Sequence, residues 1–292
     1  MNYTIGNDRL TVTLKTLSGT FSSIKMNGRE YLWQGDPDTW GGQSPICFPI
    51  CGSLRNETAS TLDGKVLHMG RHGFVRKRDF HFGEQGKDCA SLVFESSEET
   101  KEMYPYDFRL TASYKLEGNK ILVRYDVTNT GDSPLPFCIG GHTGYRCPLD
   151  EGEDYSDYEV VFEKNEQTDV PTPVAATKLL DTEKRMPIPM EGNVLPLSHD
   201  LFANDLLVFD QMQSKLVYLH KKGETKGVRV SFDLPFLVLW SSGKPADFLA
   251  IEPWQGNCTC ENEDDVFDHK PGVLYAKPGE TRGIGFTIEI LD

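Results

Sequence analysis

His142 and Glu252 are the two residues of this chain best suited to share acid and base chemistry. His142 lies among glycines in residues 140–145, and Glu252 follows the apolar residues 248–251, where a carboxylate is costly unless it is paired or functional. Trp254, two residues further on, offers a flat apolar face of the kind that stacks on a sugar ring. We therefore predict acid–base chemistry on a carbohydrate.

The composition limits the classes of protein to which the chain can belong. Its 292 residues are 38% hydrophobic and 25% charged, which is typical of a globular protein with one large all-β domain or two ordinary ones. The formal net charge of −14 repels nucleic acid phosphates and anionic lipids. A neutral small molecule is the more natural ligand, and we expect no nucleic acid or membrane partner and a monomer or homodimer.

Targeting signals and metal patterns are missing from the sequence. Residues 1–10 lack the basic patch and apolar run of a signal peptide, which predicts a cytoplasmic location. The seven cysteines fit no common zinc spacing, so we predict reduced thiols. The acidic residues 261–265 lack the glycine and distal glutamate of a calcium loop, so a solvated loop is favoured and no metal is expected.

Alternation of apolar and polar residues predicts strands almost throughout the chain. Residues 107–130 contain two alternating runs around a turn and indicate a β-hairpin, and Asn27-Gly28 indicates a second hairpin between residues 24–26 and 31–33. Helical character is limited to short turns, such as one around residues 200–204. Pro253 cannot donate a central-strand hydrogen bond, so we expect the strand before it to end at Glu252. Further strands are expected at residues 91–96, 157–163, 206–209, 216–220, 227–234, 236–241, 248–252 and 283–291.

These elements must position five polar segments. No internal repeat or linker divides the chain, so the closely spaced strands predict one domain over residues 1–292, a sandwich or a barrel. Phosphate loops, dinucleotide fingerprints and nucleophile elbows are absent. Taken singly, each polar segment has a structural explanation, such as a turn or a surface ion pair. The segments are residues 48–56, 72–76, 140–145, 201–205 and 250–254.

Together, the five segments resemble a known family. The ordered set of Phe-Pro-x-x-Gly with Arg-Asn, His-Gly-Phe-Val-Arg, Gly-Gly-His, Asn-Asp and Glu-Pro-Trp is similar to the aldose 1-epimerases, or galactose mutarotases, and most similar to their LacX-like subgroup. Residues 30–40 also resemble that subgroup. The resemblance covers nearly the whole chain and implies an isomerase with a large antiparallel β-sandwich, a sugar cleft and no catalytic metal or organic cofactor.

The resemblance also implies roles for individual residues. Glu252 would be the base that removes the proton from the anomeric hydroxyl, and His142 the acid that protonates the ring oxygen. After rotation about C1–C2, the roles would reverse and the ring would close as the other anomer. Asp205 is expected to favour protonated His142 and to hold a sugar hydroxyl, and His72 and Arg76 are expected to hydrogen-bond the sugar.

One position departs from the family pattern. Many members have arginine directly after the glycine of the Phe-Pro motif, whereas this chain has Ser53 there and Arg55 two residues on. In a strand these positions share a face, so we expect Arg55 and the adjacent Asn56 to reach the substrate. Two alternatives to a free-hexose mutarotase stay open. One is a hexose-6-phosphate mutarotase that uses the basic residues 71–78, and the other is a non-catalytic sugar-binding sandwich.

Overall fold

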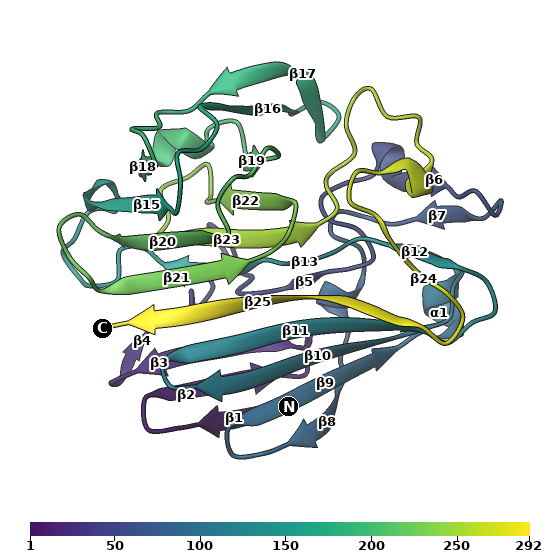
Figure 1. The fold of residues 1–292 in the computed structure, drawn as a ribbon, viewed down its shortest axis with the longest axis horizontal. Coiled ribbons are helices and arrows are strands. Elements are labelled where there is room, and N and C mark those ends of the chain that lie inside the picture. Colours follow the sequence, from purple (N-terminus) through teal and green to yellow (C-terminus); the bar gives the residue numbers. More distant parts are fainter.

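Two large antiparallel sheets form the layers of a β-sandwich in the computed structural model, which describes residues 1–292 (Figure 1). The larger sheet has nine strands in the order β18 (Val194–Pro196), β15 (Tyr158–Phe162), β20 (Leu216–Lys221), β21 (Gly227–Phe232), β25 (Thr281–Leu291), β11 (Lys120–Asn129), β10 (Phe108–Glu117), β9 (Cys89–Glu95) and β8 (His81–Gln85). The other has the order β19 (Leu207–Phe209), β22 (Phe236–Trp240), β23 (Phe248–Gln255), β13 (Ile139–Gly141) and β5 (Ile46–Cys47), with β14 (Thr143–Arg146) also paired to β23.

Smaller elements surround these layers. They are a four-stranded sheet of β1 (Asn2–Gly6), β2 (Leu10–Lys15), β3 (Thr20–Met26) and β4 (Arg29–Glu30), and the pairs β12 (Leu135–Phe137) with β24 (Leu274–Ala276), β16 (Asp169–Val174) with β17 (Leu179–Pro187), and β6 (Thr58–Ser60) with β7 (Val66–His68). The helices are short: α1 (Glu98–Lys101) and the 3-10 helices η1 (Arg55–Glu57), η2 (Val75–Lys77), η3 (Tyr155–Asp157), η4 (His199–Phe202) and η5 (Phe267–His269).

The core lies between the two large sheets. Phe286 on β25 fits against Gly141 on β13, where a Cβ added to the glycine would come within 2.7 Å of the phenylalanine ring. Phe286 also packs edge-on against Tyr125 of β11, with ring centroids 5.7 Å apart. A single cluster of 75 buried residues continues through both layers, so the two sheets share one core.

The hairpin predicted from residues 107–130 is confirmed. Strands β10 and β11 pair from Phe108↔Asn129 to Glu117↔Lys120, with apolar residues alternately buried along both. The turn at Asn27 and Gly28 is also confirmed, although the strand after it, β4, covers only residues 29–30. η4 occupies the expected helical turn, and α1 is a four-residue helix that the sequence pattern did not indicate.

The prediction that the strand before Pro253 ends at Glu252 is wrong. β23 continues to Gln255, and Pro253 pairs with Leu237 of β22. On its other edge, β23 pairs with β14 up to Ile251 and with β13 from Trp254 onward, so Glu252 and Pro253 have no ladder partner there. The strand tolerates a proline because the ladder is already interrupted at that point.

The strand β25 has a particular place in the nine-stranded sheet. It follows all other strands in the chain, yet it lies between β21 and β11 and pairs with both along most of its length. The four strands on the β21 side and the four on the β11 side are therefore joined through β25 alone (Figure 1). No helix in the structure has the length and apolar character needed to cross a membrane.

Candidate active site

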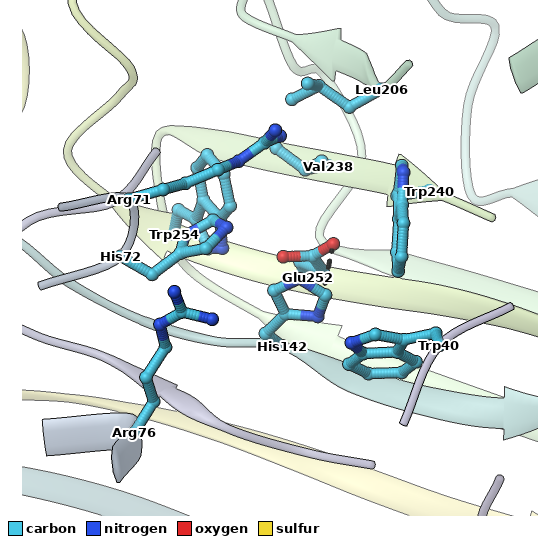
Figure 2. A pocket seen from close by; sticks show the side chains of 10 residues that line it. All are labelled: Trp40, Arg71, His72, Arg76, His142, Leu206, Val238, Trp240, Glu252 and Trp254. Carbon is cyan, nitrogen blue, oxygen red and sulfur yellow. Dashed lines mark ion pairs between the residues drawn. The ribbon is translucent and has the colours of Figure 1, made fainter. Parts of the chain in front are cut away.

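Ten side chains gather around a pocket of about 520 Å³ on the six-stranded sheet (Figure 2). Glu252 and Trp254 come from β23, and Val238 and Trp240 from the neighbouring β22. The remaining lining residues come from four loops or short elements distant in sequence: Trp40, Arg71, His72, Arg76, His142 and Leu206. The pocket therefore brings together three of the five polar segments found in the sequence, residues 72–76, 140–145 and 250–254.

Sheet register places His142 beside Glu252. His142 is the single residue between β13 and β14, and it lies opposite the stretch of β23 that lacks a ladder partner. Its Nδ1 is 3.5 Å from Oε1 of Glu252, the contact that Figure 2 draws as a dashed line. Because Glu252 lies on β23 and His142 lies between the two strands that pair with β23, the relative position of the two side chains is set by the backbone hydrogen bonds of the sheet.

The glycines around His142 make room for aromatic walls. A Cβ on Gly140 would lie 2.3 Å from Cδ1 of Trp254, and a Cβ on Gly144 would lie 2.6 Å from Cζ3 of Trp40. Any larger residue at either position would displace a tryptophan that lines the pocket. The glycine spacing noticed in the sequence is therefore required for the close approach of two indole rings.

Aromatic rings hold the imidazole of His142 from several sides. Trp40 stacks on it with centroids 5.0 Å apart and an interplanar angle of 28°. Trp240 and His72 meet it edge-on, at 5.6 Å and 5.1 Å. This packing fixes the ring and also lines the pocket with flat apolar faces, which suit the C–H faces of a sugar.

Four polar atoms of the lining residues are buried without a hydrogen-bond partner. They are Nε of Arg76, Nδ1 of His142, Oε2 of Glu252 and Nε1 of Trp254. Buried polar atoms are nearly always satisfied, because each unsatisfied one costs free energy. A cluster of four around one pocket is therefore typical of a site that a polar ligand completes.

Burial governs the protonation of the pair. It raises the pKa of Glu252 well above its usual value of 4.5 and lowers the pKa of His142 to about 3. The positive charge of Arg71 also lowers the pKa of His142. At a pH between the lowered pKa of His142 and the raised pKa of Glu252, the pair in the free pocket therefore holds one proton. Burial favours the uncharged arrangement, in which Glu252 carries this proton. The charged arrangement contains the same proton, moved to His142 across the 3.5 Å contact.

These pKa shifts predict opposite effects of pH on stability. Glu252 has a raised folded pKa, so its contribution is fully present below about pH 4.5 and is lost as pH rises through that folded pKa. His142 has a lowered folded pKa, so its contribution is present above about pH 6.5 and is lost as pH falls toward 3. We expect Glu252→Gln to raise the Tm relative to the wild type increasingly at alkaline pH, and His142→Asn to do so increasingly at acid pH. Thermal unfolding of the three proteins across this range measures it, and pH-independent differences would contradict it.

His72 is held as a hydrogen-bond donor toward the pocket. The backbone N–H of Gly52 donates to its Nδ1 at 3.1 Å, and Sγ of Cys47 lies 3.3 Å from the same atom. Burial lowers the pKa of His72 well below 6.5, and the neutral ring must then carry its proton on Nε2. His72 thus offers an N–H to a sugar oxygen, in keeping with the substrate-binding role expected for it.

Asp205 does not lie where the sequence interpretation placed it. We expected it beside His142, but its Oδ2 forms an ion pair with Nη1 of Arg71 at 3.0 Å and its side chain lines a neighbouring cavity. Its negative charge raises the pKa of Glu252 and does not contribute to that of His142. Arg76, which does line the pocket, has no carboxylate partner, and its Nε is buried without a hydrogen bond.

Arg55 and Asn56 lie outside this pocket, so their prediction as substrate ligands is not supported by their position. Residues 55–57 form the 3-10 helix η1 and not a strand, and Asn56 has a left-handed φ of 52°. The rule that alternate residues share a face therefore does not apply. Arg55 instead binds the acidic loop, with Nε 3.0 Å from Asp265 and Nη2 3.0 Å from the carbonyl of Glu261.

Sequence reasoning missed several lining residues. Arg71 directly precedes His72 in a segment already singled out, and Trp40 lies in the N-terminal segment that resembles the LacX-like subgroup. Trp240 lies near the end of the strand expected at residues 236–241, and an aromatic side chain at a strand end was the available signal. Nothing in the sequence around Val238 and Leu206, beyond their apolar character, indicates that they line a site. No group of three or more histidine, cysteine or acidic side chains is placed to hold a metal ion.

Comparison with known proteins agrees with this geometry. The family model for aldose 1-epimerase matches residues 1–287. The chain belongs to the aldose 1-epimerase family. The chromosomal protein LacX of Lactococcus lactis subsp. lactis is 38% identical over 299 residues, which cover all of both chains.

Solved structures of the family share the same fold. A galactose mutarotase related enzyme from Lactobacillus acidophilus superposes with a TM-score of 0.92 at 30% identity, covering 100% of this chain and 98% of the other. A galactose mutarotase-like protein from Lactobacillus casei ATCC 334 gives 0.91 at 25% identity, with full coverage of both chains. The expected galactose mutarotase-like β-sandwich is confirmed, and membership of the aldose 1-epimerase family supports a mutarotase-type function.

Proposed function

We propose that this protein is an aldose 1-epimerase that interconverts the α and β anomers of a free hexose. The observation that carries the proposal is the buried contact of 3.5 Å between His142 and Glu252, in a pocket walled by three tryptophans. One proton shared by two groups supplies the acid and the base that ring opening requires. Family membership supports the same reaction.

In the proposed mechanism, the entering sugar completes the unsatisfied polar atoms of the site. With its proton on His142, the pair has an ionised Glu252 that takes the proton from the anomeric hydroxyl while His142 donates to the ring oxygen. The C1–O5 bond breaks and C1 becomes a carbonyl. Rotation about C1–C2 presents the other face, and the reverse proton transfers close the ring. Both groups return to their starting state, so no cofactor is consumed.

Neighbouring residues would orient the sugar. All four line the pocket, and in this proposal Nε2–H of His72 and the guanidinium of Arg76 donate to sugar oxygens while Trp254 and Trp240 offer flat faces to the ring. Donors of this kind stabilise the negative charge that grows on an oxygen as its proton leaves. Polarimetry of freshly dissolved α-glucose and α-galactose, with and without the protein, tests the proposal. Binding of either sugar without faster mutarotation would favour a non-catalytic sugar-binding sandwich instead.

A hexose 6-phosphate is the second candidate substrate, because Arg76 lacks a carboxylate partner and its Nε is buried unsatisfied. The other pocket arginine, Arg71, is already neutralised by Asp205, and Arg55 is bound to the acidic loop. A phosphate would thus meet one unpaired arginine within a chain of net charge −14. A neutral hexose needs that arginine only as a hydrogen-bond donor.

We therefore expect a higher kcat/KM for free glucose or galactose than for glucose 6-phosphate, with little dependence on salt. Side-by-side mutarotation assays at low and high ionic strength measure both quantities. If glucose 6-phosphate is the better substrate and added salt weakens its use steeply, the neutral-sugar proposal is wrong. Arg76→Gln would then be the variant to examine first, because it removes the unpaired charge.

A further inference from the structure

We propose that a second cavity, beside the catalytic pocket, binds a small, doubly charged oxyanion such as sulfate or phosphate between Lys15, Arg76 and Lys77. This anion cavity has a volume of about 770 Å³ and is lined by the β2–β3 turn, residues 40–45 and η2. The binding site stands independently of the mutarotase function, whereas its effect on catalysis rests on the function proposed above.

The three cations of the anion cavity have no carboxylate to neutralise them. None of the twelve lining residues is acidic. Lys15, Arg76 and Lys77 also form no ion pair elsewhere, unlike the neighbouring Arg78, which pairs with Glu99. In a chain of net charge −14, three unopposed positive charges around one cavity reverse the sign of the local field and attract an anion.

Lys15 is the cation that most needs a negative partner. It is half-buried at the end of β2, and burial lowers the pKa of its ammonium below the usual value of 10.5. Its Nζ donates to Oε1 of Gln43 at 2.7 Å, and that amide oxygen is a neutral acceptor. A partly desolvated ammonium with only a neutral partner lacks compensating charge. A bound oxyanion would supply this charge and favour the protonated lysine.

Ser18 ties η2 to the β2–β3 turn and so brings the three cations to one cavity. Its Oγ donates to the carbonyl of Arg76 at 2.5 Å, and its N–H donates to the carbonyl of Arg78 at 2.9 Å. Both bonds use the backbone of η2 and the residue after it. The side chains of Arg76 and Lys77 therefore stay available for a ligand.

The loop of residues 41–44 adds backbone donors to the same cavity. All of these residues line it, and none of their amide N–H groups donates a hydrogen bond within the protein. Oxyanions are bound where charged side chains and free backbone N–H groups occur together, because both kinds of donor form strong hydrogen bonds with negative oxygens. The lining of the anion cavity contains both kinds.

The anion cavity shares two residues with the catalytic pocket. Arg76 and Trp40 line both, and Figure 2 shows them on the side of the pocket remote from Leu206. Lys15 and Lys77 line only the anion cavity. The oxyanion is therefore a ligand separate from the sugar, and Arg76 is the charged group through which it affects the reaction.

A bound oxyanion would change the proton equilibrium of the catalytic pair. The charged and titratable groups around His142 are Glu252, Arg71, His72 and Arg76. The positive charge of Arg76 lowers the pKa of His142, and Arg76 is the one group of this set that lines the anion cavity. An oxyanion on Arg76 offsets that charge and favours the arrangement in which His142 carries the proton. The proposed mechanism starts from this arrangement.

Calorimetric titration with sodium sulfate, at constant ionic strength set with sodium chloride, tests the site directly. The wild type should bind one sulfate. Lys15→Gln should weaken binding by about tenfold, since it removes a charge-assisted hydrogen bond, and Lys77→Gln, at an exposed position, by roughly twofold to fivefold. Lys25→Gln is the matched control, because Lys25 is exposed on β3 and lines neither cavity, and it should bind as the wild type does. Thermal unfolding checks that each variant is folded.

Mutarotation of glucose across pH, in sulfate and in chloride of equal ionic strength, tests the effect on catalysis. Sulfate keeps both negative charges over this range, whereas phosphate titrates near neutral pH. Bound sulfate should move both limbs of the pH–rate profile to higher pH and raise the rate on the acid limb by roughly twofold. Lys15→Gln should need about tenfold more sulfate for the same change.

The calorimetric measurement needs no turnover, so it separates this proposal from the proposed function. The anion site is overturned if sulfate shows no saturable binding beyond that of chloride, or if Lys15→Gln binds sulfate as well as Lys25→Gln does. Normal sulfate binding by a protein that does not accelerate glucose mutarotation supports the site and contradicts the mutarotase function alone. If glucose 6-phosphate is the better substrate and sulfate competes with it but not with glucose, the cavity holds the phosphate of a substrate, and a separate oxyanion ligand is overturned.

Discussion

Glu252→Gln is expected to lower the rate of mutarotation by at least about 100-fold, the lower end of what loss of a general base costs. Glutamine keeps the size and hydrogen-bonding capacity of the side chain but cannot take the proton of the anomeric hydroxyl. The carboxylate lies in a buried pocket beside His142, where water has little access to replace it. Sugar binding should be largely kept, because His72 and Arg76 are unchanged.

The measurement is polarimetry at saturating sugar, combined with a binding titration. Trp40, Trp240 and Trp254 line the pocket, so intrinsic fluorescence can report occupancy without turnover. Glu183→Gln is a suitable control, since Glu183 is exposed on β17, far in sequence from every lining residue. Near-normal turnover by Glu252→Gln would exclude Glu252 as the base.

His142→Asn is expected to give a folded protein with little activity. Asparagine remains polar and small enough for the space beside Trp40, but it cannot carry a proton between the substrate and Glu252. The native enzyme should show a bell-shaped pH–rate profile whose limbs belong to the coupled pair. The acid limb follows protonation of His142, whose pKa burial lowers to about 3, and the alkaline limb follows loss of the proton that burial retains on Glu252.

Mutarotation rates from about pH 3 to about pH 10 reveal both limbs. His81→Asn, at an exposed histidine of β8, should behave as the wild type. If His142→Asn were active and kept both limbs, the acid would have to be another group. A profile without limbs, together with an active variant, would contradict the assignment of the pair.

Local periodicity was sufficient to predict most strands. Residues of β10 and β11 alternate between core and solvent, and a one-residue slip would expose every buried side chain, so the hairpin is encoded in the pattern itself. The predicted ends of strands were wrong where contacts between distant parts of the chain determine them. β23 runs through Pro253 because the break between β13 and β14 lies opposite, and no local rule reveals that break.

The site was predicted unevenly for a related reason. His142, Glu252, His72, Arg76 and Trp254 converge on the pocket, as expected from their glycine and proline contexts. Arg55 was misplaced because a rule for strands was applied to a 3-10 helix, whose acidic partners come from a loop about 200 residues away. Such distant ion pairs depend on tertiary packing and leave no periodic signal in the sequence.

The position of β25 has a consequence for how the chain is made. During synthesis, one edge of β11 and one edge of β21 stay unpaired until residues 281–291 leave the ribosome, because β25 is the strand that pairs with both of these edges. Unpaired edges of long apolar strands are templates for intermolecular pairing. The nascent protein is therefore most vulnerable to aggregation while β11 and β21 have left the ribosome and β25 has not, and the insertion of β25 both unites the sheet and removes that hazard.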